Sequence, residues 1–395
     1  MQFGVRRMFL GATAIAVTCL VGATGAAGQA GSAQSAPSTP GTAEKVPVSE
    51  EVFKTILVLK GLPVDNFFES MGMFANALGN DCTFCHSPKA YFDKGEFATQ
   101  TPRMNRARQM IVMMNSINKQ YFKGEPRVTC FTCHGGSESP RAEPNIMLQY
   151  GVPIEDPNIR QFPSDDSFSA AETFDKYIQA LGGTARLAKF TSFAAKGSYS
   201  GFDTALGKIA VEMYGRSQPN GAPQQETIIH MFNGDSYRTF DGKSGWMAGP
   251  DTPMPLVPLT EGNLDRAKLE AMIPFPTDMK NTFPEWRTAR TAIDDKEVRV
   301  VQGIRDGQVW ANFYFDQSGL LVRIVRWTRT PVGFIPTHID VSDYREVAGV
   351  KFPFKKIVTQ TYMQMTIELS DVQANVTLPG SRFAKPAPVI RKPSA

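Results

Sequence analysis

The sequence predicts an α+β protein of two domains, in which a helical N-terminal module precedes an antiparallel β domain. The chain has 395 residues, more than a single hydrophobic core usually covers. Apolar residues recur at helical spacing through residues 52–117, whereas short alternating segments separated by turn residues fill residues 208–369. This change of period between the two regions predicts the order of the domains.

The composition is that of a globular protein, with 42% hydrophobic and 20% charged residues. The formal net charge is +4, and basic and acidic residues are spread evenly along the chain. A charge this small over this length does not favour nucleic acid or a strongly anionic membrane as a partner. We therefore set nucleic-acid binding aside.

Residues 1–30 have the features of a secretory signal peptide. Arg6 and Arg7 precede an apolar run, and small residues near Ala27 and Ala30 offer cleavage sites. We therefore expect the mature protein to be exported to the periplasm.

Two alternatives would leave the protein associated with a membrane. The apolar run over residues 8–21 could remain as an anchor, but Gly and Thr interrupt it. Cys19 could carry a lipid, but the residues before it match a lipidation box poorly. After the signal peptide, residues 31–50 begin with a stretch of Ser, Ala, Pro and Gly, which predicts a flexible tether.

The pentad Cys-x-x-Cys-His occurs twice within residues 51–136, and this pentad is the attachment signature of c-type haem. Two thiols three positions apart can each add to one vinyl group of the same porphyrin, while the adjacent imidazole binds the iron. Each pentad therefore predicts one covalently attached haem c. The predicted residues are Cys82, Cys85 and His86 in the first pentad and Cys130, Cys133 and His134 in the second.

Two other chemistries also use Cys-x-x-Cys pairs. Four thiolates could form a structural zinc site and leave both histidines idle, and a single pair could form a dithiol redox centre. A dithiol centre usually lies in a βαβ unit, and no strand pattern flanks either pair. All cysteines after the signal peptide belong to the pentads, which fits an exported protein that uses its thiols for haem attachment.

Three helices are predicted around the pentads: a short one over residues 52–59, a second over 64–78 and a third over 104–117. Met71 lies eleven residues before Cys82, and Met110 lies twenty residues before Cys130. Methionine sulfur is a soft donor that suits low-spin haem iron. Methionines at helical spacing also fill hydrophobic cores, so the residues alone leave both interpretations open.

The region around the pentads resembles the cytochrome c subunit of photosynthetic reaction centres. In that family each repeat supplies its axial methionine from the helix ahead of its pentad. The resemblance therefore implies that Met71 and Met110 are distal iron ligands, with Met113 and Met114 as neighbours that could replace Met110. The stretches that carry the resemblance are residues 58–63, 67–71, 78–86, 107–111, 117–118 and 128–135.

The resemblance covers roughly a quarter of the chain and departs from the family in two respects. Four haems are usual in the family, whereas this chain has two pentads. The bis-His haem of the family has no counterpart, because His230 and His338 lie far downstream. The implied partner is a membrane electron-transfer complex, such as a photosynthetic reaction centre, or a redox protein of a non-photosynthetic envelope.

Residues 137–166 contain five prolines and predict an extended linker, residues 167–385 predict the β domain, and residues 386–395 form a tail. A helix is predicted between Ser169 and Gly182, and another over 263–272 that covers the open mouth of the sheet. Strands joined by tight turns predict an antiparallel sheet. The predicted strands are 208–214, 227–232, 237–240, 298–302, 309–315, 320–327, 338–344, 351–356 and 362–369.

This order of elements is similar to the half-barrel fold of periplasmic lipoprotein-carrier and lipoprotein-sorting proteins. Those carriers hold acyl chains in an apolar concavity, so the resemblance implies a hydrophobic, lipid-like or quinone-like ligand. His230 and His338 lie on predicted strands, where a single His is more often hydrogen-bonded structure than a metal ligand. No nucleophile elbow, phosphate loop or paired-carboxylate motif occurs in this region.

Together these patterns predict a periplasmic electron carrier rather than an enzyme. An iron held between His and Met has no open position for a substrate. The alternatives are a two-haem peroxidase-like enzyme, in which one iron lacks its sixth ligand, and a lipid- or quinone-binding carrier whose haems are accessory.

Overall fold

The structure is a computed structural model that describes residues 45–140, 142–151, 156–201, 207–219 and 221–390. From Val46 onward the described residues form one compact unit. The predicted signal peptide and most of the predicted tether lie outside the described residues. The boundaries proposed between the helical module, the linker and the β domain stay a prediction. Within the described ranges, no helix combines the length and the apolar character needed to cross a bilayer.

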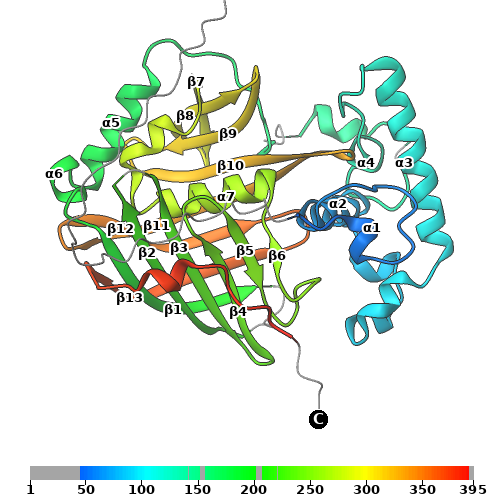
Figure 1. Cartoon of the computed structure of the whole chain (residues 1–395). Helices are drawn as coiled ribbons and strands as arrows, with labels where there is room; N and C mark the ends of the chain where they lie inside the picture. The colour runs from blue at the N-terminus through cyan, green and yellow to red at the C-terminus, as the bar shows by residue number, and fades with distance from the viewer. Residues whose placement is uncertain (1–44, 141, 152–155, 202–206, 220, 391–395) are drawn as a thin grey trace, which may run out of the picture. The chain divides into compact units, whose positions relative to one another are not determined.

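The N-terminal part is helical, as predicted (Figure 1). The hydroxyl of Thr101 accepts a hydrogen bond from the backbone of Met104 at 3.2 Å and so caps the third helix. Gly79, with a φ of 64°, ends the second helix. The α-helices are α1 (Ser49–Val52), α2 (Val64–Leu78), α3 (Pro102–Tyr121) and α4 (Cys130–His134), and the 3-10 helices are η1 (Cys82–Phe84), η2 (Pro88–Tyr91) and η3 (Lys94–Ala98).

The predicted short helix over residues 52–59 is wrong. Helix α1 ends at Val52, and the backbone of Thr55 and Leu59 has φ values of 62° and 61°. A left-handed residue cannot continue a right-handed helix. The Ser49 hydroxyl instead donates to the Leu59 carbonyl at 2.8 Å, which folds this segment back on α1 as a loop.

The C-terminal part is an antiparallel sheet, which in the described residues has 13 strands in the order β6-β5-β4-β3-β2-β1-β13-β12-β11-β10-β9-β8-β7. All nine predicted strands are present, as β2 to β4 and β8 to β13, whereas β1, β5, β6 and β7 were not predicted. The strands are β1 (Ser192–Gly201), β2 (Ile209–Gln218), β3 (Gly221–Met231), β4 (Gly234–Phe240), β5 (Gly245–Ala248), β6 (Val257–Pro258), β7 (Glu285–Ile293), β8 (Lys296–Arg305), β9 (Gln308–Phe315), β10 (Leu321–Thr330), β11 (Gly333–Val347), β12 (Val350–Thr359) and β13 (Gln364–Ala374).

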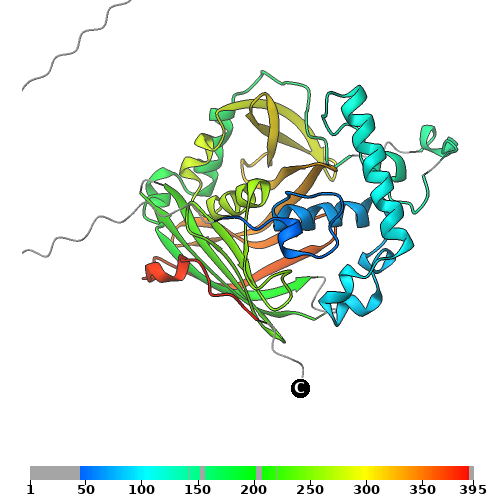
Figure 2. The ribbon, with the colours of Figure 1, turned by 45° about the vertical axis from the view of Figure 1, so that its right-hand side comes forward.

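Helix α7 lies across the concave side of the curved sheet, as Figures 1 and 2 show. The main hydrophobic core lies between this side and the helices, where Leu269 of α7 and Phe174 of α5 join strand residues such as Phe313 and Phe352. The predicted fold class, helices followed by an antiparallel sheet with covering helices, is therefore confirmed. The remaining helices are η4 (Ile146–Gln149), α5 (Ala170–Leu181), α6 (Thr184–Leu187), α7 (Glu261–Met272), η6 (Pro276–Asn281) and η7 (Gly380–Phe383).

Three charged side chains lie between α7 and the sheet, of which Arg266 and Glu270 are buried and Lys356 is 13% exposed. Arg266 Nε donates to Glu270 Oε1 at 2.6 Å, and Lys356 Nζ donates to Glu270 Oε2 at 2.5 Å. Burial would raise the pKa of Glu270, but the charges of Lys356 and Arg266 outweigh it and hold that pKa at about 2. Glu270 is therefore ionised at neutral pH and fixes α7 to β12.

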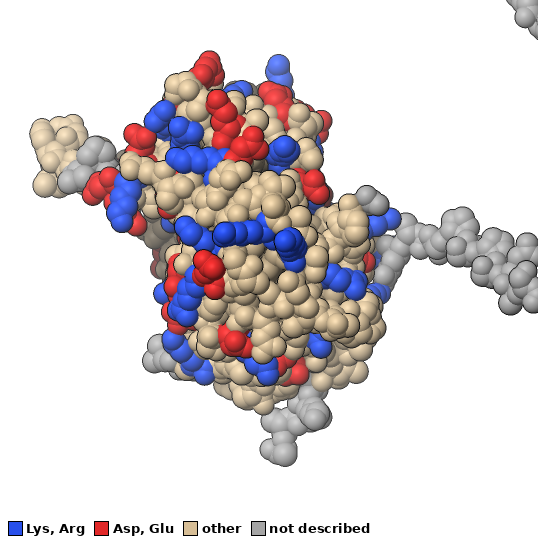
Figure 3. Space-filling model, turned by 90° about the vertical axis from the view of Figure 1, so that its left-hand side faces the viewer, with Lys and Arg blue, Asp and Glu red and all other residues tan. Residues whose placement is uncertain are grey.

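The outer surface carries both signs of charge. Figure 3 shows one face on which basic and acidic side chains are interspersed and separated by uncharged surface. This mixture agrees with the small net charge of +4.

Helix α2 is joined to the β part of the chain through Asp65, in its first turn. The Asp65 carboxylate accepts hydrogen bonds from the backbone N and the hydroxyl of Thr260, at 2.7 and 2.8 Å, and from Asn263 Nδ2 at 3.2 Å. The side chain is buried, and this burial raises its pKa from 3.8 to about 6, because the hydrogen bonds from Thr260 offset the burial only in part.

We expect Asp65 to make the protein less stable as the pH rises. The folded pKa lies above the unfolded one, so the protonated form favours folding below about pH 4, and this contribution disappears as the pH passes about 6. The shift corresponds to at most about 3 kcal/mol in the free energy of unfolding. Urea unfolding between pH 4 and pH 7 should show a smaller decline for Asp65→Asn than for the wild type. Asp175→Asn, on the exposed side of α5, is the matched control, and equal pH slopes in all three proteins would contradict this role of Asp65.

Candidate functional site

The first pentad lies on η1 and is attached to the start of α3. Asp81 caps η1, since its Oδ1 accepts from the backbone N and the hydroxyl of Thr83 at 2.8 and 2.6 Å. The Thr101 hydroxyl donates to the carbonyl of Cys85 at 2.7 Å, and Arg103 Nη1 donates to the carbonyl of Phe84 at 2.9 Å. The backbone of the first pentad is thus held by side chains from α3.

The second pentad forms α4 and is attached to the end of α3. Asn118 is buried, and its side chain brackets Val128 with two hydrogen bonds: Nδ2 donates to the Val128 carbonyl at 2.7 Å, and Oδ1 accepts from the Val128 N at 2.9 Å. Thr129 and Thr132 then cap α4 reciprocally, side chain to backbone, at 3.0 and 3.3 Å. Helix α3 therefore holds one pentad at each of its ends.

The role of Asn118 and Thr101 was not predicted from the sequence. Asn118 follows Ile111 by seven residues and Met114 by four, which places it on the same side of the helix as these two buried residues. A polar residue on an otherwise apolar side of a helix often makes a structural hydrogen bond, and this pattern was the available indication for Asn118.

Helix α2 lies between the sheet and α3 (Figures 1 and 2) and touches the second pentad at its C-terminal end. The backbone N of Gly136 donates to the carbonyl of Ala77 at 3.0 Å. Gly79 packs directly on this turn, because a Cβ at Gly79 would lie 2.4 Å from the carbonyl oxygen of Gly136. The helix that carries Met71 therefore supports the second pentad as well as preceding the first.

Both pentad histidines are oriented in the same way. His86 Nδ1 lies 3.0 Å from the carbonyl oxygen of Phe97, and His134 Nδ1 lies 3.1 Å from that of Ser137. A carbonyl oxygen can only accept, so Nδ1 carries a proton in both rings, and in the neutral ring Nε2 keeps its lone pair. Burial also lowers the pKa of His86, which favours its neutral form. This is the tautomer and ring orientation that a metal-ligating imidazole needs.

Among the described residues, none of the pentad cysteines forms a disulfide; Cys82 and Cys133 are exposed, whereas Cys85 and Cys130 are partly buried. Burial raises the pKa of Cys82 and Cys85, and it raises that of Cys130 to about 11. The four-thiolate zinc alternative needs both pairs at one point. In the part of the chain that the structure describes, no three His, Cys, Asp or Glu side chains come together in a group that could hold a metal ion.

The methionines of α3 differ in their surroundings. Met110 is partly buried, as is Met71 on α2. Met113 is 46% exposed, whereas Met114 is 4% exposed and packs with Met73 against Val332, in the turn between β10 and β11, and Ile335 of β11. Met114 is thus engaged in the core between the helices and the sheet, and Met110 lies one turn earlier on the same side of α3.

Several large apolar side chains of the N-terminal helical part are exposed to solvent. Exposed apolar surface of this kind often marks a binding site. A porphyrin offers two apolar faces, so these side chains, together with the thiol pairs and the two oriented imidazoles, fit haem c. They are Leu57, Tyr91, Phe92, Phe97, Val112, Tyr121, Phe122 and Phe131.

The two histidines outside the pentads are engaged in hydrogen bonds. His230 Nδ1 pairs with Asp235 Oδ1 at 2.9 Å, and His338 Nε2 pairs with Asn158 Oδ1 at 2.9 Å. A hydrophobic ligand of the β domain stays a prediction. Two cavities at the sheet measure about 70 and 30 Å³, which is small beside the roughly 300–1,000 Å³ of typical ligand pockets.

The N-terminal part of the chain matches a known family. Residues 7–147 match the model of the family described as photosynthetic reaction centre cytochrome C subunit. The photosynthetic reaction center cytochrome c subunit of Roseobacter denitrificans is 29% identical over 96 residues, which cover 21% of this chain and 26% of the relative. The chain thus spans about a quarter of the length of the curated relative that it matches. The resemblance predicted from the residues around the pentads is confirmed.

Solved structures similar to the chain cover about half of it. A DUF1329 family protein from Desulfovibrio piger has a TM-score of 0.38 at 9% identity and covers 54% of this chain and 96% of that one. A LolA superfamily protein from Nitrosomonas europaea has a TM-score of 0.36 at 13% identity and covers 55% of this chain and 99% of that one. Scores this low carry no argument about function.

We predict that Gly79→Ala weakens the contact between α2 and the second pentad. Gly61 and Gly79 both have a positive φ, but a Cβ at Gly61 would meet nothing within 4 Å. Gly61→Ala should therefore lower the free energy of unfolding by about 1 kcal/mol, from the backbone conformation alone. Gly79→Ala should lower it by about 2–4 kcal/mol, because the backbone of Gly136 must also move. Urea unfolding measures the free energy of unfolding of both variants. An equal decrease in the two would argue against the close contact between Gly79 and Gly136.

Proposed function

We propose that this chain is an exported di-haem c-type cytochrome that carries electrons. The observation that carries the proposal is the common orientation of His86 and His134, each with Nδ1–H on a backbone carbonyl and Nε2 available to a metal. The similarity of residues 7–147 to the reaction centre cytochrome family supports the same conclusion.

Each pentad would hold one haem through its own residues. Cys82 with Cys85, and Cys130 with Cys133, supply the thiols for thioether links. His86 and His134 are the proximal iron ligands, and their carbonyl partners keep the rings from turning. When bound, each haem supplies the one-electron couple of its iron.

Met71 and Met110 are the proposed distal ligands. A thioether sulfur favours the reduced iron and raises the potential. Met113 points largely to solvent, and Met114 packs in the core against the sheet, so their surroundings support Met110 over either neighbour. With His and Met on each iron, the chain leaves no position for a substrate, which favours an electron carrier over an enzyme.

The partner we propose is a redox protein or a membrane electron-transfer complex on the periplasmic side of the membrane. The curated relative is a photosynthetic reaction center subunit by name. This chain has two pentads, so it would pass electrons over a shorter chain of haems than the usual members of that family.

Haem content tests the proposal directly. The chain produced in a host that matures c-type cytochromes should carry two haems, seen as added mass and as two haemochromes per polypeptide. The double variant Cys82→Ala/Cys85→Ala should retain one, and so should Cys130→Ala/Cys133→Ala. A colourless protein, or one that binds zinc at the thiols, would refute the proposal.

Methionine variants test the distal ligands. Met71→Ala and Met110→Ala should each remove about half of the sulfur-to-iron charge-transfer absorption of the ferric protein and lower the midpoint potential of one haem, because a soft donor is lost. Met113→Ala is the exposed control on the same helix and should change neither. Met114→Ala should keep both ligands but lower the free energy of unfolding by about 2–5 kcal/mol, as a buried methionine does. If Met114→Ala removed the sulfur-to-iron absorption and Met110→Ala did not, Met114 would be the distal ligand in place of Met110.

A further inference from the structure

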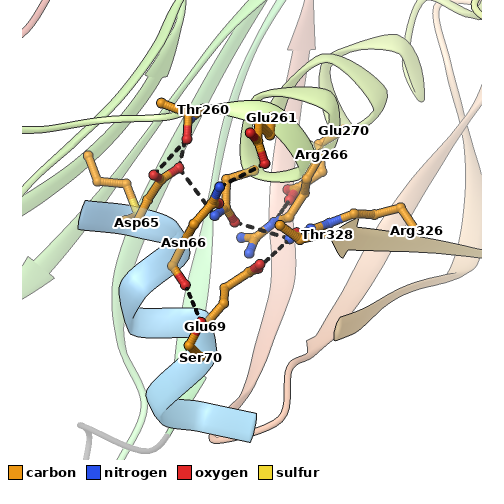
Figure 4. A network of polar contacts seen from close by, with 12 residues as sticks. Asp65, Asn66, Glu69, Ser70, Thr260, Glu261, Arg266, Glu270, Arg326 and Thr328 are labelled. Carbon is orange, nitrogen blue, oxygen red and sulfur yellow. Dashed lines mark hydrogen bonds and ion pairs between the residues drawn. The ribbon is translucent and has the colours of Figure 1, made fainter. Parts of the chain in front are cut away.

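Helix α2 directs a row of polar side chains at the β part of the chain (Figure 4). Asp65 binds Thr260, as described above. Asn66 Nδ2 donates to Glu261 Oε2 at 2.9 Å, and Glu69 accepts from Arg326 Nη2 of β10 at 2.8 Å. Positions 65, 66 and 69 share one side of the helix, so this side faces α7 and β10.

The pair formed by Glu69 and Arg326 is almost fully buried, with side-chain exposures of 3% and 1%. Arg326 Nη2 also lies 3.1 Å from Asn263 Oδ1, and Nη1 binds the Thr328 hydroxyl. The contact between Arg326 and Glu69 is made by Glu69 Oε1, and Glu69 Oε2 is buried without a hydrogen-bond partner. A buried charge without its partner is costly, so a rotation of α2 that separates this pair is strongly opposed.

Gly72 adds a steric constraint on the same helix. A Cβ at Gly72 would lie 2.3 Å from Tyr362 Cδ1 and 2.6 Å from Thr361 Oγ1. The α2 backbone therefore sits directly on the turn between β12 and β13. This contact is one residue away from Met71.

Met71 lies on the other side of α2. Successive residues of an α-helix are separated by about 100°, so Met71 is rotated by about 160° from Glu69, the shorter way round. Whatever fixes the rotation of α2 at Glu69 also fixes the direction in which Met71 leaves the helix.

We propose that Arg326 is a positioning residue for the distal methionine of the first pentad. By holding Glu69, the β domain sets the rotation of α2 and directs Met71 away from the sheet. This inference rests on the proposed function, because it takes Met71 to be an iron ligand. It gives the β domain a part in the electron carrier that no pentad residue supplies.

The test uses the full chain with both haems attached. Arg326→Met should reduce the sulfur-to-iron absorption per bound haem by up to half and lower one midpoint potential, leaving the other unchanged. Arg326→Lys keeps a positive charge for Glu69 and should restore most of the absorption. Arg323→Met is the matched control, since Arg323 lies on the same strand and pairs with the partly exposed Asp340, and it should behave as the wild type.

A second variant separates positioning from folding. Glu69→Met/Arg326→Met removes both buried charges, so it should fold about as well as the wild type, yet it lacks the pair that sets the rotation. We expect the same loss of absorption as in Arg326→Met. Hydrogen exchange gives a readout that does not depend on haem, and it should quicken over residues 64–78 but not over 102–121 in both variants.

The outcomes are distinct. Unchanged absorption in Arg326→Met, or its full recovery in the double variant, would overturn the positioning role while the proposed function stands. A wild-type protein that carries two haems but lacks the sulfur-to-iron absorption would refute the methionine ligands of the proposed function, and this inference with them.

Discussion

The buried ion pair between Glu69 and Arg326 constrains the helix on which the two halves of the molecule meet. Through this pair α2 is bound to β10, while its C-terminal end carries the turn after the second pentad through the hydrogen bond between Ala77 and Gly136. Helix α3 is attached separately, through the hydrogen bonds between Asn118 and Val128 in the segment before α4. The rotation of α2, and with it the direction of Met71, thus depends on a contact that the β part of the chain supplies.

Because the contact between Glu69 and Arg326 is an ion pair, it fixes the rotation of α2 more narrowly than an apolar contact would. Apolar contacts are non-directional, so an apolar interface of the same area would permit α2 to turn or slide. Charge-assisted hydrogen bonds require a defined geometry. A second group of charges holds α7 in the same way. Arg266 and Lys356 both donate hydrogen bonds to Glu270, and this contact holds α7 against the sheet. α7 in turn carries Thr260 and Asn263 near Asp65, so the two groups of charges support one another.

Four helices and nine strands were predicted from the sequence, and four strands were missed. The helices at α2, α3, α5 and α7 and nine strands follow from apolar spacing. Strand β1 was missed because it is rich in Ala, Gly and Ser, and it exists because β2 and β13 pair with it on both sides. Gly215 of β2 lies beneath Phe193, with no room for a Cβ, a close contact that no local pattern reveals. The short helix over residues 52–59 was wrong because Thr55 and Leu59 adopt left-handed conformations that loop closure imposes.

The proposed chemistry of the site rests on the sequence, since two thiols and an imidazole at fixed spacing act locally within one turn of chain. The two pentads, the order of the helices and the candidate methionines needed no tertiary information. What only the tertiary structure decided is orientation. Each pentad imidazole is oriented by a hydrogen bond to a carbonyl outside its pentad. The side of α2 that carries Glu69 is held by Arg326, which lies 257 residues away in the sequence. Such contacts depend on how the chain folds back on itself, because a hydrogen bond needs proximity in space and leaves no periodic trace along the sequence.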